Sequence, residues 1–282
     1  MDIITRAVHG SSVADVAWLD AAGALQGCGA VALLWDKRPA LAFTYAYEDL
    51  ARQIAAAPQL VLTFTESRST SNTFSPAALT GRPTLVEDRE GDVFSEHLLE
   101  QELRRYPPAR IFADSYLLRR EHWWYLPRLI IRLDVDAARP MPARSGAGPW
   151  ADNSRTESTG SPAESTGSRE YLLAVGVDDR VETHLATVWD GDESGSLPLA
   201  PVEDRQLPSG PAILMGQDAS FPDLAQWSTW LYRGMSTGDR LEVTEAPSNM
   251  GIGPVPSVWR RMRDQHAFGR ACRAGIARAE RR

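Results

Sequence analysis

The chain has 282 residues, of which 43% are hydrophobic and 8% aromatic, enough for one large or two modest domains with a packed core. Its formal charge of −7 argues against a general nucleic-acid surface, and no uninterrupted apolar run approaches the ~20 residues of a membrane-spanning helix. Two distant cysteines and five scattered histidines argue against a disulfide framework or a metal site, and the N-terminus lacks a signal-peptide pattern, so we expect a cytoplasmic protein.

The N-terminal residues predict a β-hairpin. Apolar and polar positions alternate over Val13–Leu19, and Gly29–Trp35 follows as a mostly apolar run. A period of two is typical of a strand with one buried face, and a continuous apolar run is typical of a strand buried on both faces. We therefore expect these two segments to open a barrel.

A strand, a short helix and a second strand are predicted between residues 37 and 64. Ala40–Tyr45 and Leu60–Phe64 are rich in β-branched and aromatic residues, whereas Glu48–Ala57 carries apolar residues at helical spacing. Pro58 closes the helix because its ring clashes with the preceding turn and it has no N–H to donate. This is the most informative stretch of the sequence.

Further elements complete the first half. The polar segment Glu66–Thr73 predicts a loop, Ala77–Leu79 the start of a strand, Phe94–Tyr106 an amphipathic helix, and Arg128–Val135 a strand with one polar face. The aromatic run Trp123–Tyr125 either packs in the core and at a dimer-type interface or forms a stacking wall for a flat ring system.

This arrangement resembles the FMN-binding split-barrel superfamily, the pyridoxamine 5'-phosphate oxidase-like proteins. In that superfamily a phenylalanine or tyrosine plus threonine ends one strand, and an apolar-x-x-Asn-Pro helix end precedes the next strand. The residues that carry the resemblance are Phe43-Thr44, Ile54, Pro58, Leu60–Phe64 and Leu79-Thr80-Gly81-Arg82. The resemblance implies a mainly β fold with short helices (α+β), a split β-barrel of six antiparallel strands over residues 13–135.

The resemblance also implies a function. Split-barrel proteins use FMN, a deazaflavin or haem, and where they catalyse, the cofactor carries the redox chemistry. The chain is then a flavin- or deazaflavin-dependent oxidoreductase that acts on an unidentified small molecule. The alternative is a non-catalytic split-barrel protein, for binding or interaction, that has lost the FMN phosphate site.

The start of the short helix favours a weak FMN site. Relatives that hold FMN usually have Ser-Arg-Lys there, where side chains and the helix N-terminus bind the phosphate. Here the three positions are Glu48, Asp49 and Leu50, and the arginine that often begins the second strand corresponds to the region Gly27–Ala30. Because carboxylates repel a phosphate, we expect FMN to bind ~10³-fold more weakly than in such relatives, unless Arg68 or Arg82 substitutes.

Five residues are the candidates for cofactor binding. Thr44 and Tyr45 end the strand that leads to the cofactor in relatives, and Arg82 begins the neighbouring strand. Arg68 and Ser69 belong to a donor-rich loop, which is either a solvated hairpin loop or an alternative phosphate or carboxylate contact. We expect them around a cleft between the two halves of the chain, and we identify no catalytic or metal-binding residue.

After residue 138 the composition of the chain changes. Residues 139–169 contain no Val, Ile, Leu, Phe or Tyr and repeat the pentapeptide Glu-Ser-Thr-Gly-Ser, which predicts a flexible linker. After a predicted loop at Asp190–Gly210, the residues Gln226–Gly234 and then Gly238–Leu241 echo Phe74–Leu85 of the first half, which indicates a degenerate duplication. Strands are predicted over Tyr171–Val177, Val181–Val188, Ala212–Met215 and Arg240–Val243.

These observations predict four parts. Residues 1–138 form a split-barrel domain, 139–169 a linker, 170–247 a diverged second barrel half, and 248–282 a basic helical tail with eight arginines between 257 and 282. The chain is then a monomeric pseudo-dimer, or else a homodimer. The basic helix is expected to dock on the acidic body, and the expected partner is a small-molecule ligand, without nucleic acid or membrane.

Overall fold

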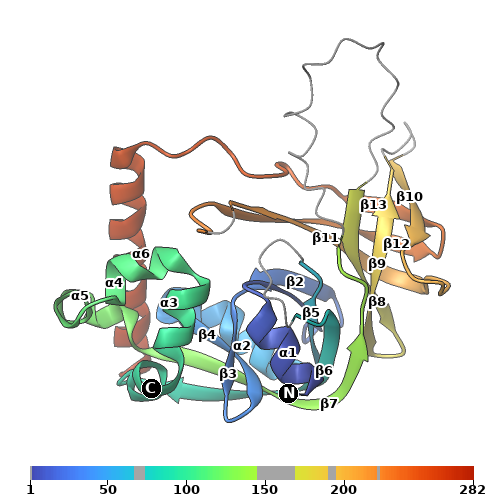
Figure 1. Cartoon of the computed structure of the whole chain (residues 1–282). Coiled ribbons are helices and arrows are strands. Elements are labelled where there is room, and N and C mark those ends of the chain that lie inside the picture. The colour runs from blue at the N-terminus through green and yellow to red at the C-terminus, as the bar shows by residue number, and fades with distance from the viewer. Residues whose placement is uncertain (1, 67–73, 145–168, 190–194, 221–222) are drawn as a thin grey trace.

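The computed structural model describes residues 2–66, 74–144, 169–189, 195–220 and 223–282 (Figure 1). The predicted loop residues 67–73 and most of the predicted linker therefore lie outside the described residues. In the described part, no helix has both the length and the apolar character needed to cross a membrane.

The first half forms one antiparallel sheet with the strand order β2-β1-β5-β6-β7-β4-β3. Its two edge strands are consecutive in the chain and are separated by Val31 alone. The segment Leu25–Trp35 therefore pairs with β1 through its first part and with β4 through its second part, so that six strand segments form a ring. The strands are β1 (Ala14–Leu19), β2 (Leu25–Ala30), β3 (Ala32–Trp35), β4 (Arg38–Thr44), β5 (Leu60–Phe64), β6 (Ala77–Asp88) and β7 (Arg128–Pro140).

The second half forms a closed antiparallel barrel with the order β10-β13-β12-β11-β8-β9. Its interior is apolar, with Leu173, Leu214 and Leu241 fully buried. The strands are β8 (Arg169–Val177), β9 (Arg180–Val188), β10 (Ser196–Pro201), β11 (Ser209–Ala219), β12 (Trp227–Thr237) and β13 (Arg240–Glu245).

The two rings have the same topology. We take β2 and β3 as one strand and number the six strands of each half in chain order. Neighbouring strands around each ring then follow the order first, second, third, sixth, fifth, fourth. A β-bulge at Gly81 interrupts the pairing of the fifth and sixth strands of the first ring, and a bulge at Gly234 does so in the second. In both places a Cβ would lie 2.0 Å from a carbonyl oxygen of the sixth strand, so only glycine fits. The predicted mainly β fold is confirmed, and the shared topology supports the duplication.

The two barrels pack directly against each other through an apolar seam. Residues of the first barrel such as Leu25 and Val61 share one buried cluster with Leu172, Ile213 and Met215 of the second. A Cβ on Gly27 would lie 2.8 Å from side-chain atoms of Ile213 and Met215. The glycines at the start of the second strand thus allow the close approach of the other barrel.

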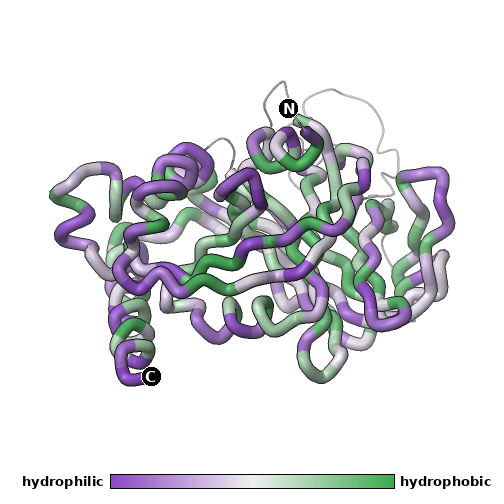
Figure 2. Tube along the Cα trace, turned by 90° about the horizontal axis from the view of Figure 1, so that it is seen from below, coloured by the Kyte–Doolittle hydropathy of each residue, from purple (hydrophilic) through white to green (hydrophobic). Residues whose placement is uncertain are grey.

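The helices lie mainly at one end of the first barrel, and α6 runs along that end (Figure 1). Cys272, Ile276 and Ala279 are buried on α6, whereas its first turns are exposed, and hydrophilic and hydrophobic residues mix along it (Figure 2). The C-terminal helix thus packs on the first barrel through an apolar face. The helices are α1 (Ile3–Gly10), α2 (Glu48–Ala56), α3 (Leu99–Arg105), α4 (Arg110–Ala113), α5 (Tyr116–Glu121) and α6 (Val258–Ala279), with short 3-10 turns at Tyr45–Tyr47, Pro107–Ala109 and Trp123–Tyr125 and a π-turn at Phe94–Leu98.

Two sequence predictions need correction. The segment 190–210 was expected to be a loop, but β10 lies within it, paired with β13 through Ser196–Pro198 and with β9 through Leu199–Pro201. Two prolines hid this strand because proline weakens any strand prediction. The helix expected over Phe94–Tyr106 begins with a π-turn and becomes α-helical only at Leu99.

Candidate functional site

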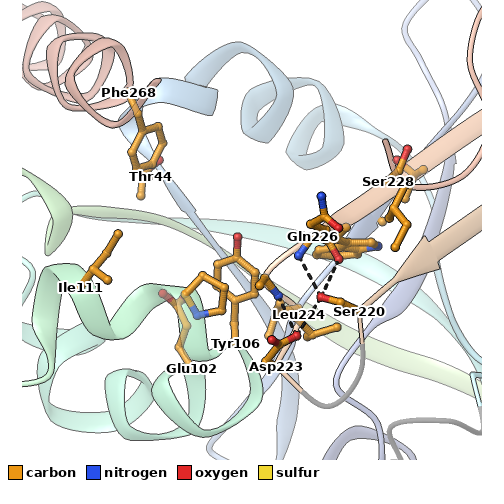
Figure 3. Close-up of a pocket in the computed structure, with 18 of the residues that line it drawn as sticks. Thr44, Glu102, Tyr106, Ile111, Ser220, Asp223, Leu224, Gln226, Ser228 and Phe268 are labelled. Atoms are coloured by element: carbon orange, nitrogen blue, oxygen red, sulfur yellow. Dashed lines mark hydrogen bonds between the residues drawn. The ribbon is translucent and has the colours of Figure 1, made fainter. Parts of the chain in front are cut away.

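A cavity of about 1210 Å³ lies where the two barrels meet the helices. The first barrel contributes the ends of β2 and β4, and the second contributes the connection between β11 and β12. The connection between β6 and β7, which carries α3 to α5, forms another wall (Figure 3). Residues 251–256, which lead into α6, complete the rim. The site is therefore built from parts that are far apart in the sequence.

Aromatic side chains line much of this cavity. Phe112 lies at the centre of the helical wall, with its ring centroid 4.8 Å from that of Tyr125 and 6.0 Å from that of Phe268 on α6. The other aromatic lining residues are Phe43, Tyr47, Tyr106 and Trp227. Such a wall suits a flat ring system, which gains contact area and favourable ring geometry from aromatic neighbours.

A buried polar group forms part of the lining. Arg128 begins β7 with no exposed surface, and its guanidinium carbon lies 3.8 Å from the ring centroid of Phe94 and 4.2 Å from that of Tyr125. Arg128 Nη2 donates to Glu102 Oε1 at 3.3 Å, and the Tyr125 hydroxyl donates to the same oxygen at 2.5 Å. Burial first, and then the Glu102 carboxylate, raise the pKa of Tyr125 well above its ordinary value, so this phenol stays protonated.

Three buried side-chain polar atoms in the lining have no hydrogen-bond partner among the described residues. Besides the Thr44 hydroxyl, they are two N–H donors, Arg128 Nε and Trp227 Nε1. An unpaired buried N–H typically costs about 1–3 kcal/mol, so such a group calls for a partner such as an ordered water molecule or a ligand. Both atoms can donate but cannot accept, so a molecule that satisfies them must present acceptor atoms.

A compact turn holds the second barrel's part of the site. Ser220 Oγ donates to Asp223 Oδ1 at 2.7 Å and accepts from the Gln226 backbone N–H at 3.0 Å (Figure 3). The Gln226 side chain donates to the Gly253 carbonyl at 3.1 Å, which ties this turn to the segment before α6. Hydrogen bonds from Ser220 and from the Ala225 backbone lower the pKa of Asp223, so its carboxylate stays charged.

The start of α6 lies at the cavity rim. Ser257 caps the helix by accepting from the Arg260 backbone N–H at 3.3 Å. Arg260 and Arg261 both line the cavity and are largely exposed. The first turn of the helix contains no acidic residue. The rim therefore carries two cationic side chains next to the positive end of a long helix.

The five predicted site residues have different locations. Thr44 is buried and lines the cavity, and Tyr45 is buried beneath α6, where a Cβ on Gly275 would lie 2.4 Å from its carbonyl oxygen. Arg82 is exposed on β6 and is not among the residues that line this cavity. Arg68 and Ser69 lie outside the described residues. Of the three predicted site residues that the structure describes, one therefore lies at the cavity wall.

The start of α2 does not fit the phosphate of FMN. Glu48 is the first residue of the helix, and its side chain is only 1% exposed. Its carboxylate is paired with Arg52 at 3.0 Å, with Arg282 at 2.7 Å and with Arg278 at 3.5 Å. The protein's own carboxylate and the C-terminal end of α6 therefore fill the place where a phosphate would need free donors.

Sequence reasoning missed the residues that define the cavity. The sequence marks Arg128 only as the first residue of a predicted strand, and Trp227 only as part of the internal echo. Arg260 and Arg261 were part of a general basic tail. Their common site depends on the packing of the second barrel and of α6 on the first, and no local pattern reports that packing.

Comparisons with known proteins are limited to solved structures, because no family model and no curated protein matches the sequence. A heme binding protein from Mycobacterium smegmatis is 12% identical, and the match covers 97% of this chain and 99% of that chain with a TM-score of 0.31. A protein of the pyridoxinephosphate oxidase family from Clostridium acetobutylicum, related to general stress protein 26, is 10% identical, with 50% and 91% covered and a TM-score of 0.31.

A third similar structure is the protein Atu2129 from Agrobacterium tumefaciens, of unknown function, which is 17% identical with a TM-score of 0.34. This match covers 51% of the present chain and spans about half, 55%, of the Agrobacterium protein. Similarities this low carry no argument about ligand or activity.

Proposed function

We propose that the chain binds a planar organic ring ligand, rich in acceptor atoms, in the cavity between its two barrels. The observation that carries this proposal is the pair of buried, unsatisfied donors, Arg128 Nε and Trp227 Nε1, in an aromatic-lined cavity. Ring carbonyls or ring nitrogens would accept from these donors while the ring faces pack on the aromatic walls. The role is that of a binding protein without the phosphate cradle of flavin enzymes.

The lining residues narrow the choice of ring. Flavins and deazaflavins carry the required carbonyl and nitrogen acceptors, but the phosphate of FMN has no place at α2. Haem requires an iron ligand, and among the described lining residues histidine, cysteine and methionine are missing, which leaves tyrosine. Haem binding is the printed role of the Mycobacterium smegmatis protein, and haem is kept here as a test ligand. The flavin-type ring is the better match to the donors.

A matched pair of tryptophan variants tests the proposal. Trp227→Phe removes the buried, unpaired indole N–H of a lining residue and keeps an aromatic ring. Trp230→Phe is the control, because Trp230 Nε1 is also buried without an acceptor, yet this residue packs in the core of the second barrel and does not line the cavity. Riboflavin, FMN and haemin are each titrated into all three proteins by fluorescence or absorbance.

The expected result is binding of at least one of these rings to the wild-type chain. Trp227→Phe should weaken it about three- to tenfold, the value of one hydrogen bond, and Trp230→Phe should leave it unchanged. Equal effects of the two variants would place the ring elsewhere. Failure of all three rings to bind below about 100 μM would overturn the proposal.

A second candidate is the flavin- or deazaflavin-dependent oxidoreductase. The observation that favours it is size, because about 1210 Å³ exceeds the ~300–1,000 Å³ usual for one drug-sized ligand and leaves room for a substrate beside a ring. A bound flavin or deazaflavin would supply hydride transfer, and the chain's residues would orient the ring and exclude water. The visible spectrum of the purified protein tests this role: a flavin or deazaflavin band supports it, and a colourless protein leaves the binding role alone.

A further inference from the structure

The fully buried arginine of the cavity is held against two aromatic rings. Arg128 begins β7 and belongs to the cavity lining, although its surface is closed to bulk solvent. Its guanidinium carbon lies 3.8 Å from the ring centroid of Phe94 and 4.2 Å from that of Tyr125. Rings this close restrict the rotamers of the side chain, so the packing fixes the direction in which each N–H points.

The positive charge of Arg128 is already balanced by carboxylates of the chain. Arg128 Nη2 donates to Glu102 Oε1 at 3.3 Å, and the Tyr125 hydroxyl donates to the same oxygen at 2.5 Å. Asp88, the register partner of Arg128 on β6, is a second buried carboxylate, and it accepts from the Phe94 backbone N–H at 2.7 Å. One guanidinium therefore has two buried carboxylates as neighbours, one through an ion pair and one through strand register.

An incoming anion would add negative charge where the chain has no positive charge to spare. Arginine commonly recognises carboxylates and phosphates, because its charge and its fork of donors match them. Here Glu102 already takes an Nη donor and the charge, and only 9% of the Glu102 side chain is exposed. A further anion beside this pair would be a buried charge without a counterion, which is strongly unfavourable.

One donor of Arg128 remains for a ligand. Arg128 Nε has no hydrogen-bond acceptor among the described residues, whereas Nη1 donates to the Pro127 carbonyl at 3.4 Å. An amide carbonyl, a lactam carbonyl or a ring nitrogen can accept from Nε and leaves the charge balance of the pair unchanged. The site therefore offers a hydrogen bond to an acceptor and no net positive charge to an anion.

We propose that Glu102 determines the specificity of the Arg128 end of the cavity, which selects an uncharged acceptor group and excludes an anion. The inference rests on the proposed ring-binding function and names the chemical group that the ring presents there. Arg128 contacts the ligand, and Glu102, which comes from α3 in the helical wall, acts through Arg128 (Figure 3). The ligand class is a planar heteroaromatic ring with a neutral carbonyl or ring nitrogen at the Arg128 end.

A matched pair of probes tests this specificity. Quinoxaline-2-carboxamide and quinoxaline-2-carboxylate share a flat ring with nitrogen acceptors and differ in the charge of one substituent at neutral pH. Both are titrated by calorimetry into the full-length chain, Glu102→Gln and Glu100→Gln. Glutamine at position 102 keeps the shape and an acceptor oxygen but removes the charge. Glu100→Gln is the control, because it removes the same charge from the same helix at a side chain that is 79% exposed and does not line the cavity.

We expect the wild-type chain to bind the amide about tenfold more tightly than the carboxylate, or better. Glu102→Gln should abolish or reverse this preference through about tenfold tighter binding of the carboxylate, because the charge of Arg128 is then no longer cancelled by its ion pair. Glu100→Gln should keep the preference of the wild-type chain.

A second variant keeps the test decisive if Glu102→Gln does not fold. Glu102→Gln/Arg128→Gln removes both charges of the pair together. It should still prefer the amide but bind it about tenfold more weakly than the wild-type chain does, because the Nε donor is lost.

Four results would overturn the proposal. A wild-type preference for the carboxylate, or a preference that Glu102→Gln leaves unchanged, would remove the specificity and leave the ring site intact. Equal effects of the two single variants would show a general charge effect. Amide binding that the double variant does not weaken would mean that water, and not the ligand, satisfies Arg128 Nε. The fourth is that neither probe binds below about 1 mM, whereas the ring site itself is decided by the Trp227→Phe comparison.

Discussion

The two barrels share a strand order and differ in what they bury. The first half and the segment that follows it bury eight charged side chains, whereas the described residues of the second half bury one aspartate and one histidine, Asp218 and His184. Buried charge is costly unless it is paired, so each of these side chains needs a partner inside the protein. The eight are Asp15, Glu48, Glu66, Asp88, Glu102, Arg105, Arg128 and Arg144.

The connections between strands are also longer in the first barrel than in the second. Between its third and fourth strands the first barrel has α2, whereas the second has only residues 202–208. Between the fifth and sixth strands the first barrel carries α3 to α5, and the second has the two-residue turn Gly238-Asp239. Both halves thus have the barrel framework, while α3 to α5, which form one wall of the cavity, belong to the first half alone. The first barrel therefore carries long helical connections where the second has short loops.

The largest expected loss of stability tests whether the bulge glycines of the two barrels have equivalent roles. Gly81→Ala and Gly234→Ala should each destabilise the chain by about 3 kcal/mol or more, because a Cβ would lie 2.0 Å from a backbone oxygen of the next strand. Gly253→Ala is the control, since no heavy atom lies within 4 Å of its added Cβ. Urea denaturation measures all three. A large effect at Gly81 with none at Gly234 would show that the two bulges are not equivalent.

The next effect concerns a buried charge of the first barrel. Asp15 pairs with Arg144 at 3.0 Å, yet burial outweighs this partner and raises the pKa of Asp15 to about 6 from its ordinary 3.8. The folded chain therefore binds this proton more readily than the unfolded chain does. The contribution of Asp15 to stability is most favourable below pH 4 and is lost as the pH rises through 6.

The size of this loss is on the order of 2–3 kcal/mol, from a shift of roughly two pKa units. Asp15→Asn cannot titrate, so the difference in free energy of unfolding between wild type and variant should change by that amount between pH 4 and pH 7. Urea denaturation across this range measures it. A difference that is constant with pH would contradict the buried, proton-binding state of Asp15.

A smaller effect tests how Glu48 holds the C-terminal end of α6 against α2. Glu48→Gln leaves the arginines at positions 52, 278 and 282 without their shared carboxylate and should cost about 2 kcal/mol. It should also speed hydrogen exchange in the last turns of α6. The neighbouring Asp49→Asn is the control, because Asp49 is exposed and its loss should stay within about 0.5 kcal/mol. Equal exchange rates in the two variants would show that the Glu48 ion pairs do not hold the end of α6 in place.

Local patterns were enough to predict much of the fold. The strand, helix and strand of residues 38–64 follow from β-branched runs, helical spacing and Pro58, and the structure confirms them. The echo between the Gly81 and Gly234 segments marks the two bulged strands. β10 was missed because its stability comes from pairing on both sides with β9 and β13, which overrides the poor strand propensity of its prolines.

The candidate site was less predictable for a physical reason. Thr44 could be found because it ends a strand with a recognisable pattern, and the conflict at Glu48 could be read from charge alone. Trp227 and Arg261 become site residues only when the second barrel and α6 pack against the first. A cavity between distant segments is a property of tertiary packing, which a single sequence without such packing does not display.

The most direct test of the central claim, that one chain builds one ring site between its own two barrels, is the binding stoichiometry. Isothermal titration with the ring that binds best is combined with light scattering of the same sample, which gives the mass of the particle. The account predicts one ring per chain, whatever the number of chains in the particle, with weaker binding in Trp227→Phe. One ring per two chains, or two rings per chain, would contradict it.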